Sequence, residues 1–341
     1  MDTLPVGKLP IELVGRLISK VEREDKQVVL GPSIGEDAAI LRLSDRLLVV
    51  ETDPVTFATD LVGWYAVHIN ANDIATRGVK PRWFLATLLL PERCTYQDAE
   101  NVFNQILSAC HSLDITLVGG HTEISYGLQR PIVVGCMLAE AGDQPIIMTS
   151  GAKPGDDIVL TKGIAIEGAA ILARRAARQL FSAGLSKDVI ERAANYLFSP
   201  GISVVKEALI ARSGVPVNCM HDPTEGGLST GLLEIASAAK VGILVKESSI
   251  PVLAECKVIC DSLNLDPLGL LASGALIITL PATETPKLLG LLHQAGIEAN
   301  VIGEITEPDK GLKIFTEAGM RDLPRFDRDE LARFLEAQSD D

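Results

Sequence analysis

The residues of this chain best suited to chemistry are carboxylates that stand beside glycines or at the ends of apolar runs. They are Asp37 in GEDAA, Asp53 after the apolar run at 47–50, Asp73 in NANDIATRG, Glu123 in GGHTE and Asp222 in HDPTEGG. Side chains at strand ends project from rigid supports toward the edge of a sheet, where α/β proteins place their sites. We therefore expect these acids to gather in the fold, although they are far apart in sequence.

Gathered carboxylates would repel one another, and each would raise the pKa of its neighbours unless a cation lay between them. Mg²⁺ is a hard cation that binds carboxylate and phosphate oxygens together, so an acidic chain can hold ATP through it. Backbone N–H groups of small residues would add positive charge around the phosphates. Lys162, in Thr161-Lys162-Gly163 at a predicted strand end, is the basic side chain expected nearest to them.

Each acid also has a purely structural interpretation. For Asp37 and Asp53 the alternative is a place in a turn or at a helix N-cap, which is typical of aspartates near glycine turns. Asp73 shares a predicted helix face with Asn70 and Arg77, so an alternative is a salt bridge to Arg77 on a solvated surface.

The segment Asp222-Pro223-Thr224-Glu225 has the sequence of a helix start, with Asp222 as the N-cap and Glu225 at the third position. His121 and His221 each stand beside one of the acids. A histidine in that place is as typical of a hydrogen bond that orients a ligand as of a catalyst.

The elements that must position these acids follow from the apolar periodicity. Strands are predicted at 46–51, 82–90, 115–118 and 131–139, and near 157–161, 217–221, 242–247, 274–280, 299–305 and 312–316. Helices are predicted at 10–21, 62–77 and 95–113, and near 165–180, 188–195, 203–212, 224–239 and 284–295. Thr95 and Asp98 predict a capping box for the third helix. The sequence thus favours a mixture of strands and helices in both halves.

A segment rich in glycine, proline and aspartate at 141–157 marks the predicted domain boundary. We expect an N-terminal domain at 1–145, a C-terminal domain at 150–310, and a strand with a helical tail at 311–341. A length of 341 residues is enough for each domain to bury its own core.

The composition excludes several classes of protein. There are 31 Lys and Arg against 45 Asp and Glu, a net charge of −14, and 47% of residues are hydrophobic, which excludes a disordered chain. The acidic balance argues against nucleic-acid or membrane partners. No apolar run reaches the roughly 18–20 residues of a membrane span, and no signal region opens the sequence, so we expect a soluble, cytoplasmic protein.

The six cysteines do not predict a disulfide framework at this chain length. Cys110 and Cys136 are expected to be small buried hydrophobes. The pair Cys256 and Cys260 lacks the second pair that a tetrahedral zinc site would need.

The ordered motifs GEDAA, ETD, NANDIATRGVKP, GGHTE and DPTEGGL resemble the superfamily of aminoimidazole ribonucleotide (AIR) synthase. Its relatives include thiamine-monophosphate kinase, selenophosphate synthetase and the hydrogenase-maturation factor HypE. The resemblance spans about residues 30–305. GGHTE, the stretch TKGIAIEGAAILA at 161–173 and the DPT-GGL turn are most similar to HypE.

The resemblance implies an α/β (α+β) fold of two domains. The N-terminal domain would pair with its twin through its sheet to close a β-barrel, which gives a homodimer, and the C-terminal domain would be an α/β sandwich. It also implies Mg-ATP bound by the motif carboxylates. The metal ligands would be Asp37, Asp53, Asp73 and Glu123; further nucleotide contacts would come from Gly35, Asn72, Gly119, Gly120 and Lys162; and Glu123, Asp222 and His121 would serve catalysis.

Two departures from the family pattern stand out. His121 occupies the position where the kinase and synthase relatives carry an acid, which leaves Glu123 as the local carboxylate. HypE proteins have a Pro-Arg-x-Cys tail whose thiol receives a carbamoyl group that ATP then dehydrates. Here Pro324-Arg325 is followed by Phe326 and Asp327, and no cysteine follows Cys260. A carboxylate cannot replace the sulfur nucleophile.

Three functions remain open at this point. The first is a HypE-like ATP-dependent enzyme that activates a carbonyl or carbamoyl oxygen by phosphorylation, in hydrogenase maturation or a related assembly process. The second is a small-molecule kinase resembling thiamine-monophosphate kinase, against which the histidine of GGHTE argues mildly. The third is a nucleotide-sensing assembly partner without turnover.

Overall fold

The computed structural model describes residues 7–21, 25–58, 60–142 and 145–338. The chain divides into two compact units. The smaller unit comprises residues 24–31 and 37–146, and the larger unit comprises residues 1–23, 32–36 and 147–341. The chain therefore passes from the larger to the smaller unit between Glu36 and Asp37, inside the first acidic motif.

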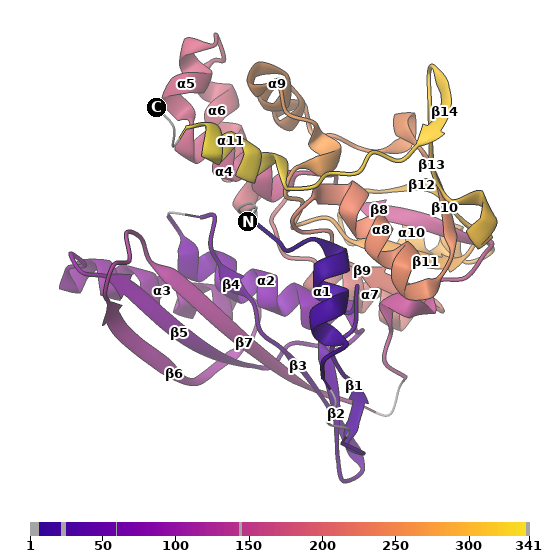
Figure 1. The fold of residues 1–341 in the computed structure, drawn as a ribbon, viewed down its shortest axis with the longest axis horizontal. Helices are drawn as coiled ribbons and strands as arrows, with labels where there is room; N and C mark the ends of the chain where they lie inside the picture. The colour runs from indigo at the N-terminus through magenta and orange to yellow at the C-terminus, as the bar shows by residue number, and fades with distance from the viewer. Residues whose placement is uncertain (1–6, 22–24, 59, 143–144, 339–341) are drawn as a thin grey trace. The chain divides into compact units, whose positions relative to one another are not determined.

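The smaller unit is a seven-stranded sheet with helices on one face (Figure 1). Its strands are β1 (Val28–Leu30), β2 (Ala39–Leu43), β3 (Arg46–Glu51), β4 (Pro54–Val55), β5 (Trp83–Pro91), β6 (Thr116–Ser125) and β7 (Ile132–Ala141). The order is β1-β2-β3-β7-β5-β6, with β4 against β7. Only the β5–β6 pair is parallel. The helices are α2 (Val62–Thr76) and α3 (Tyr96–Ser112).

The two helices of the smaller unit differ in how their sequences position them. All of α2 except Trp64 is buried, so its polar residues Asn70, Asn72 and Asp73 lie inside the protein. The capping box predicted for α3 is confirmed, because Thr95 and Asp98 bond each other's backbone N–H. The predicted strands β3, β5 and β7 are also confirmed, each within two residues at either end.

The larger unit contains a second seven-stranded sheet, of order β14-β13-β10-β12-β8-β11-β9. Its strands are β8 (Asp156–Thr161), β9 (Cys219–His221), β10 (Gly242–Lys246), β11 (Ile277–Pro281), β12 (Ala299–Thr306), β13 (Leu312–Thr316) and β14 (Gly319–Asp322). Only β10 and β13 pair in parallel. A core of branched aliphatic side chains, such as Ile158, Leu160 and Ile277 on the sheet and Leu232 on the adjoining helix, fills the space beneath the helices.

The larger unit also contains helices (Figure 1). They are α1 (Ile11–Ile18), α4 (Ile166–Arg175), α5 (Ala177–Ser182), α6 (Lys187–Ala194), α7 (Val205–Gly214), α8 (Gly227–Ala239), α9 (Ala254–Leu263), α10 (Thr285–Gln294) and α11 (Glu330–Ala337). The helix predicted in the tail at 311–341 is confirmed by α11. The single helix predicted at 165–180 is wrong, because the chain breaks at Ala176 into α4 and α5.

Two predicted motif conformations are also wrong. The strand predicted to end at residue 118 continues through GGHTE, which forms the middle of β6 and keeps the parallel pairing with β5. The helix predicted from Asp222 begins only at Gly227, so Asp222 is not its N-cap and Glu225 lies outside it. Gly226 and Gly227 have φ of +80° and +64°, a conformation that delays the helix and that favours glycine.

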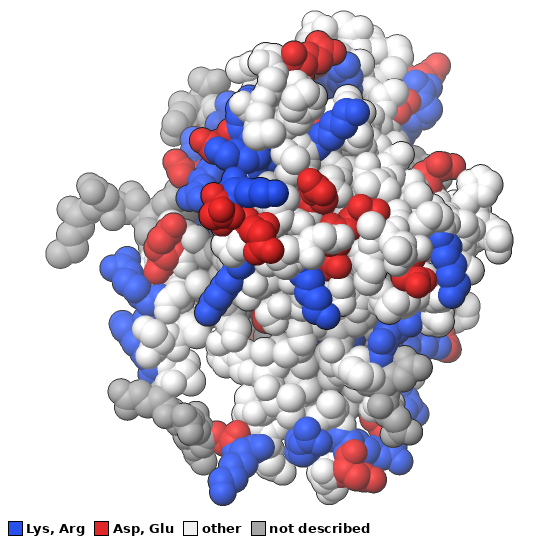
Figure 2. All heavy atoms as spheres, turned by 90° about the vertical axis from the view of Figure 1, so that its right-hand side faces the viewer, with Lys and Arg blue, Asp and Glu red and all other residues white. Residues whose placement is uncertain are grey.

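The surface charges and the apolar character of the helices bear on what the protein can contact. On the face shown in Figure 2, acidic and basic side chains are interspersed rather than separated by sign. Among the described residues, no helix combines the length and the apolar character that crossing a lipid bilayer requires.

Two expectations about cysteines are met in part. Cys110 is buried as predicted, whereas Cys136 is only partly buried. The buried thiols of Cys256 and Cys260 lie 3.9 Å apart on α9. Within the described ranges, no grouping of metal-binding side chains includes them.

Candidate functional site

The smaller unit brings together two of the predicted metal ligands, Asp37 and Asp73. A carboxylate oxygen of Asp37 lies within 4.8 Å of one of Asp73. Asp73 projects from the buried helix α2 and is 7% exposed. Asp37 lies just before β2, at the point where the chain enters this unit. Two hard oxygen ligands this close suit one divalent cation, so the donor set fits Mg²⁺.

Arg77 compensates part of this negative charge. Its guanidinium is completely buried, and Nη2 donates to Asp37 Oδ2 at 3.1 Å. Arg77 Nε also donates a hydrogen bond to the hydroxyl of Thr76. The alternative of a solvated salt bridge between Asp73 and Arg77 is wrong about the environment, because neither side chain lies on a solvated surface.

The backbone of Asp53 is held by hydrogen bonds to the side-chain amide of Asn70. Its N–H donates to Asn70 Oδ1 and its carbonyl accepts from Asn70 Nδ2, both at 3.2 Å. The carbonyl also accepts from the N–H of Gly135 on β7. A Cβ at Gly135 would lie 2.4 Å from Asn70 Oδ1, so only glycine leaves room for Asn70 there. The sheet and α2 thus fix the position of the Asp53 backbone. Asn72, two residues after Asn70 on α2, is fully buried.

The GGHTE residues lie on the exposed edge strand β6. His121 Nε2 is 3.2 Å from Glu123 Oε2, and the hydroxyl of Ser125 donates to Glu123 Oε1. The hydrogen bonds from His121 and Ser125 lower the pKa of Glu123. A Cβ at Gly120 would lie 1.9 Å from the carbonyl oxygen of Ala86, so the close β5–β6 pairing requires glycine. Glu123 and Asp53 do not join the close grouping of Asp37 and Asp73.

In the larger unit, Asp222 follows β9 directly and is 2% exposed. Its neighbour His221 places Nε2 2.9 Å from Glu234 Oε2 on α8. Lys8 donates to the other oxygen of Glu234 at 2.7 Å. Burial alone would raise the pKa of Glu234, but Lys8 and His221 outweigh it and lower the pKa. His221 is therefore fixed by α8, which fits an orienting role beside Asp222.

The loop that precedes Asp37 is anchored in the larger unit. Gly35 has φ +77°, and a Cβ there would lie 2.8 Å from the carbonyl oxygen of Glu234. Glu36 accepts hydrogen bonds from the backbone N–H groups of Thr149 and Ser150. Gly35 and Glu36 therefore fix the path of the chain into Asp37; contact of Gly35 with a nucleotide remains a prediction.

Lys162 occupies a different environment from the one expected. Its Nζ donates to the carbonyl oxygens of Gly201 and Ser203 and forms a salt bridge of 2.8 Å with Glu207. Both charged side chains are almost fully buried. Burial lowers the pKa of Lys162, although Glu207 opposes the shift. An ammonium has three protons, and all three are engaged. This geometry favours a structural role over the predicted phosphate contact.

Three residues that support the site were not among those predicted to form it. They are Asn70, Gly135 and Glu36. An isolated glycine inside the apolar strand pattern of β7 is a signal of close backbone approach, and it could have identified Gly135. Nothing in the local sequence connects Asn70 to Asp53.

Two family models match the chain. The N-terminal domain of AIR synthase related protein matches residues 35–141, and its C-terminal domain matches residues 153–314. A protein of Methanocaldococcus jannaschii named for hydrogenase expression/formation is 28% identical over 328 residues, which cover 93% of this chain and 94% of the relative. Carbamoyl dehydratase HypE of Cupriavidus necator is 31% identical over 80% of this chain and 77% of its own.

Solved structures show the same fold. A HypE–HypF complex matches with a TM-score of 0.75 at 22% identity and covers 92% of this chain and 99% of the other. HypE in complex with ATP matches with a TM-score of 0.67 at 24% identity, and the match covers 93% of this chain and 96% of the other. AaThiL complexed with AMPPCP and TMP matches with a TM-score of 0.70 at 18% identity, and the match covers 93% of this chain and 95% of the other. The chain belongs to the AIR synthase related family, with the two-domain α/β fold of its HypE members.

Proposed function

We propose that this protein binds Mg-ATP and uses it to activate a carbonyl- or carbamoyl-type acceptor, as a HypE-like enzyme of metallocentre maturation. The observation that carries the proposal is the Asp37–Asp73 pair beside the buried Arg77. Relatives named carbamoyl dehydratase and the ATP complex of HypE support the same assignment. The cytoplasmic location expected from the sequence is part of this proposal.

The proposed metal ligands are Asp37, Asp53 and Asp73, with Glu123 as the further carboxylate of the motif set. When bound there, Mg²⁺ supplies charge neutralisation for the phosphates. Asn72, Gly35, Gly119 and Gly120 are the proposed nucleotide contacts that remain.

The reaction that fits is phosphorylation of the acceptor oxygen. That oxygen attacks the γ-phosphorus in line, the bond to the β–γ bridging oxygen breaks, and ADP leaves with the electron pair. For a carbamoyl acceptor, the C–O bond then breaks, phosphate leaves, and loss of two N–H protons gives a C≡N group. We assign acceptor positioning and proton acceptance to Glu123, Asp222 and His121.

We further propose that the acceptor is carried by another molecule. The Pro324-Arg325 segment of this chain continues into Phe326, whose ring packs against Gly269: a Cβ there would lie 2.4 Å from Phe326 Cδ1. This segment is packed on the larger unit and offers no thiol. A partner in assembly is consistent with the HypE–HypF complex among the similar structures.

Calorimetry with ATP tests the proposal, in the presence of Mg²⁺ and again after chelation by EDTA. We expect binding that is lost, or weakened at least tenfold, without the metal. Release of ADP that depends on an added carbamoyl donor would then support turnover. Folded protein that binds no ATP with Mg²⁺ present would exclude the proposal.

A kinase activity resembling that of thiamine-monophosphate kinase is the second candidate, favoured by the fold likeness to AaThiL. Phosphate transfer to a small phosphorylated or alcohol substrate, without a carbamoyl donor, would establish it. Tight ATP binding without turnover on any acceptor would instead indicate a nucleotide-sensing partner.

We propose that β6 mediates a homodimer. It is the last strand of its sheet, eight of its ten residues are exposed, and Val118 and Ile124 are 51% and 55% exposed. A long apolar edge strand is a template for pairing with another chain. We expect light scattering to show a dimer that Val118→Lys with Ile124→Lys converts to a monomer. The control, Val258→Lys at an exposed position of α9, should remain dimeric. A monomeric wild type would contradict the proposal.

A further inference from the structure

A buried carboxylate from the C-terminal segment reaches the turn that carries Asp222. Asp329 is 3% exposed and precedes α11. Its Oδ2 accepts the backbone N–H of Gly226 at 2.7 Å, and its Oδ1 accepts that of Leu331 at 2.7 Å. Gly226 is the N-cap of α8 and has no side chain to satisfy the helix's first N–H groups. Asp329 supplies an oxygen there from 103 residues away.

The tail and the turn also share a third segment, the loop at 266–272. Glu330 accepts the N–H of Asp266 at 3.0 Å. The loop then meets the turn: the N–H of Ala272 donates to the carbonyl of Thr224, and a Cβ at Gly227 would lie 2.5 Å from the carbonyl oxygen of Leu268. The turn therefore cannot shift without disturbing both the loop and the tail.

We propose that Asp329 is a positioning residue, which holds the turn at 222–227 and thereby the Asp222 carboxylate. The inference rests on the proposed function, because it takes the Asp222 turn as part of the working site. Asp329 touches no substrate in this scheme. It acts through the Gly226 N–H, and α11 becomes part of the support of the site.

The protonation of Asp329 provides a readout for this role. Burial raises the pKa of its carboxyl to about 7, the Glu225 charge adds to the shift, and the N–H donors of Gly226, Leu331 and Leu271 oppose it. The other charged groups around it are Asp266, Glu330 and the Arg333 that pairs with Glu330. An ionised carboxylate accepts more hydrogen bonds than a protonated one, so the hold on Gly226 should weaken below about pH 7.

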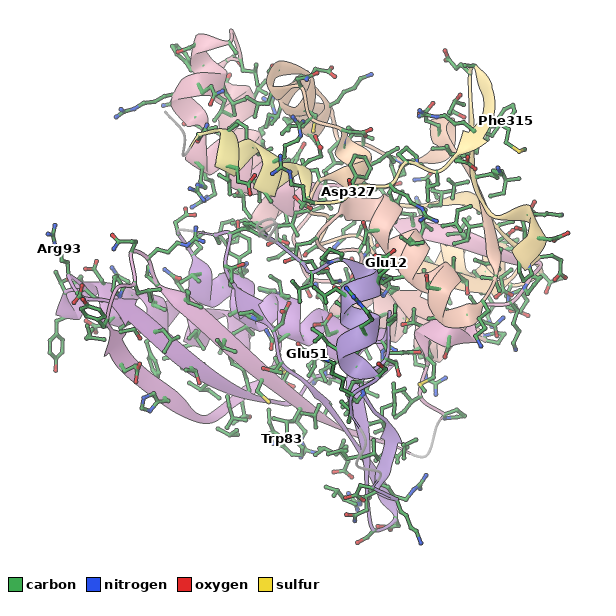
Figure 3. The ribbon with its side chains drawn as sticks, in the orientation of Figure 1. Glu12, Glu51, Trp83, Arg93, Phe315 and Asp327 are labelled. Carbon is green, nitrogen blue, oxygen red and sulfur yellow. The ribbon has the colours of Figure 1, made fainter. Side chains whose placement is uncertain are left out.

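The test compares Asp329→Asn with Asp327→Asn in the full-length protein. Asp327 is an exposed acid of the same segment (Figure 3). We expect Asp329→Asn to lower kcat/KM for ATP ten- to a hundredfold, because small misplacements of working groups are costly. We also expect it to flatten the dependence of kcat/KM on pH between 6 and 8. Asp327→Asn should retain the wild-type rate and profile.

Hydrogen exchange of the peptide at 222–230 gives a second measurement that needs no turnover. In the wild type, protection corrected for intrinsic exchange should fall as the pH drops below about 7, and in Asp329→Asn it should be low at every pH. Unchanged protection in the variant and a pH-independent wild type would overturn the inference. A wild type that binds no ATP but shows the expected exchange would overturn the proposed function instead. The inference that Asp329 holds the turn at 222–227 would then still be supported.

Discussion

Replacing Asp73 with asparagine is expected to weaken Mg-ATP binding by about a hundredfold, roughly 2.8 kcal/mol, and to leave the fold intact. The variant keeps the size and the hydrogen-bonding oxygen of the side chain. It removes one of the two charged ligands that lie within 4.8 Å of each other, and a neutral amide is a poorer ligand for Mg²⁺. Calorimetry with and without Mg²⁺, together with thermal unfolding, measures both effects.

Asp37→Asn is the informative companion to this variant. It removes the other ligand, but it also breaks the ion pair between Asp37 and the completely buried guanidinium of Arg77. Breaking a buried ion pair costs about 3–5 kcal/mol; because Asp37 is partly exposed, we expect the lower end of that range. Asp37→Asn should therefore lose both Mg-ATP affinity and stability, whereas Asp73→Asn should lose Mg-ATP affinity and keep its stability.

A surface acid provides the control for both variants. Asp114 is exposed and pairs with Lys80, so Asp114→Asn should change neither affinity nor stability appreciably. Wild-type affinity in Asp73→Asn would contradict the metal assignment. A large loss of stability in that variant without a loss of affinity would show that the Asp73 carboxylate serves the packing of α2.

Much of the fold could be predicted because the sequence encodes it locally. The capping box before α3 and the apolar alternation of β5 and β7 act over a few residues, and each was predicted close to its observed bounds. Glycine pairs were the main source of error. Gly119-Gly120 indicates a turn by local propensity, but the parallel partner β5 imposes an extended path, and Gly120 provides the close approach to Ala86.

The site could be predicted only in part, because much of its support consists of contacts between distant residues. The types and spacing of Asp37 and Asp73 sufficed to predict that they meet. Asp53 bonds through its backbone to the side-chain amide of Asn70 and to the N–H of Gly135, and these contacts between distant segments leave no periodic signal. Likewise, Asp329 bonds to Gly226 across 103 residues, and neither residue's neighbours indicate the other.

Variants of Lys162 should give the largest change in stability. Lys162→Met is expected to destabilise the protein by about 3–5 kcal/mol, because it leaves Glu207 as an uncompensated buried charge. ATP affinity should stay within twofold of the wild type, since all three ammonium protons serve Gly201, Ser203 and Glu207. Denaturant unfolding and calorimetry measure the two quantities.

The double variant Lys162→Met with Glu207→Leu separates charge from packing. It removes both buried charges and should recover part of the lost stability; the carbonyls of Gly201 and Ser203 still lack their donor, which keeps the recovery incomplete. The control Lys187→Met breaks an exposed pair with Glu191 and should cost under about 1 kcal/mol. If Lys162 instead contacts a phosphate, Lys162→Met would lose ATP affinity tenfold or more and Glu207→Gln would not, because only the first removes the cation.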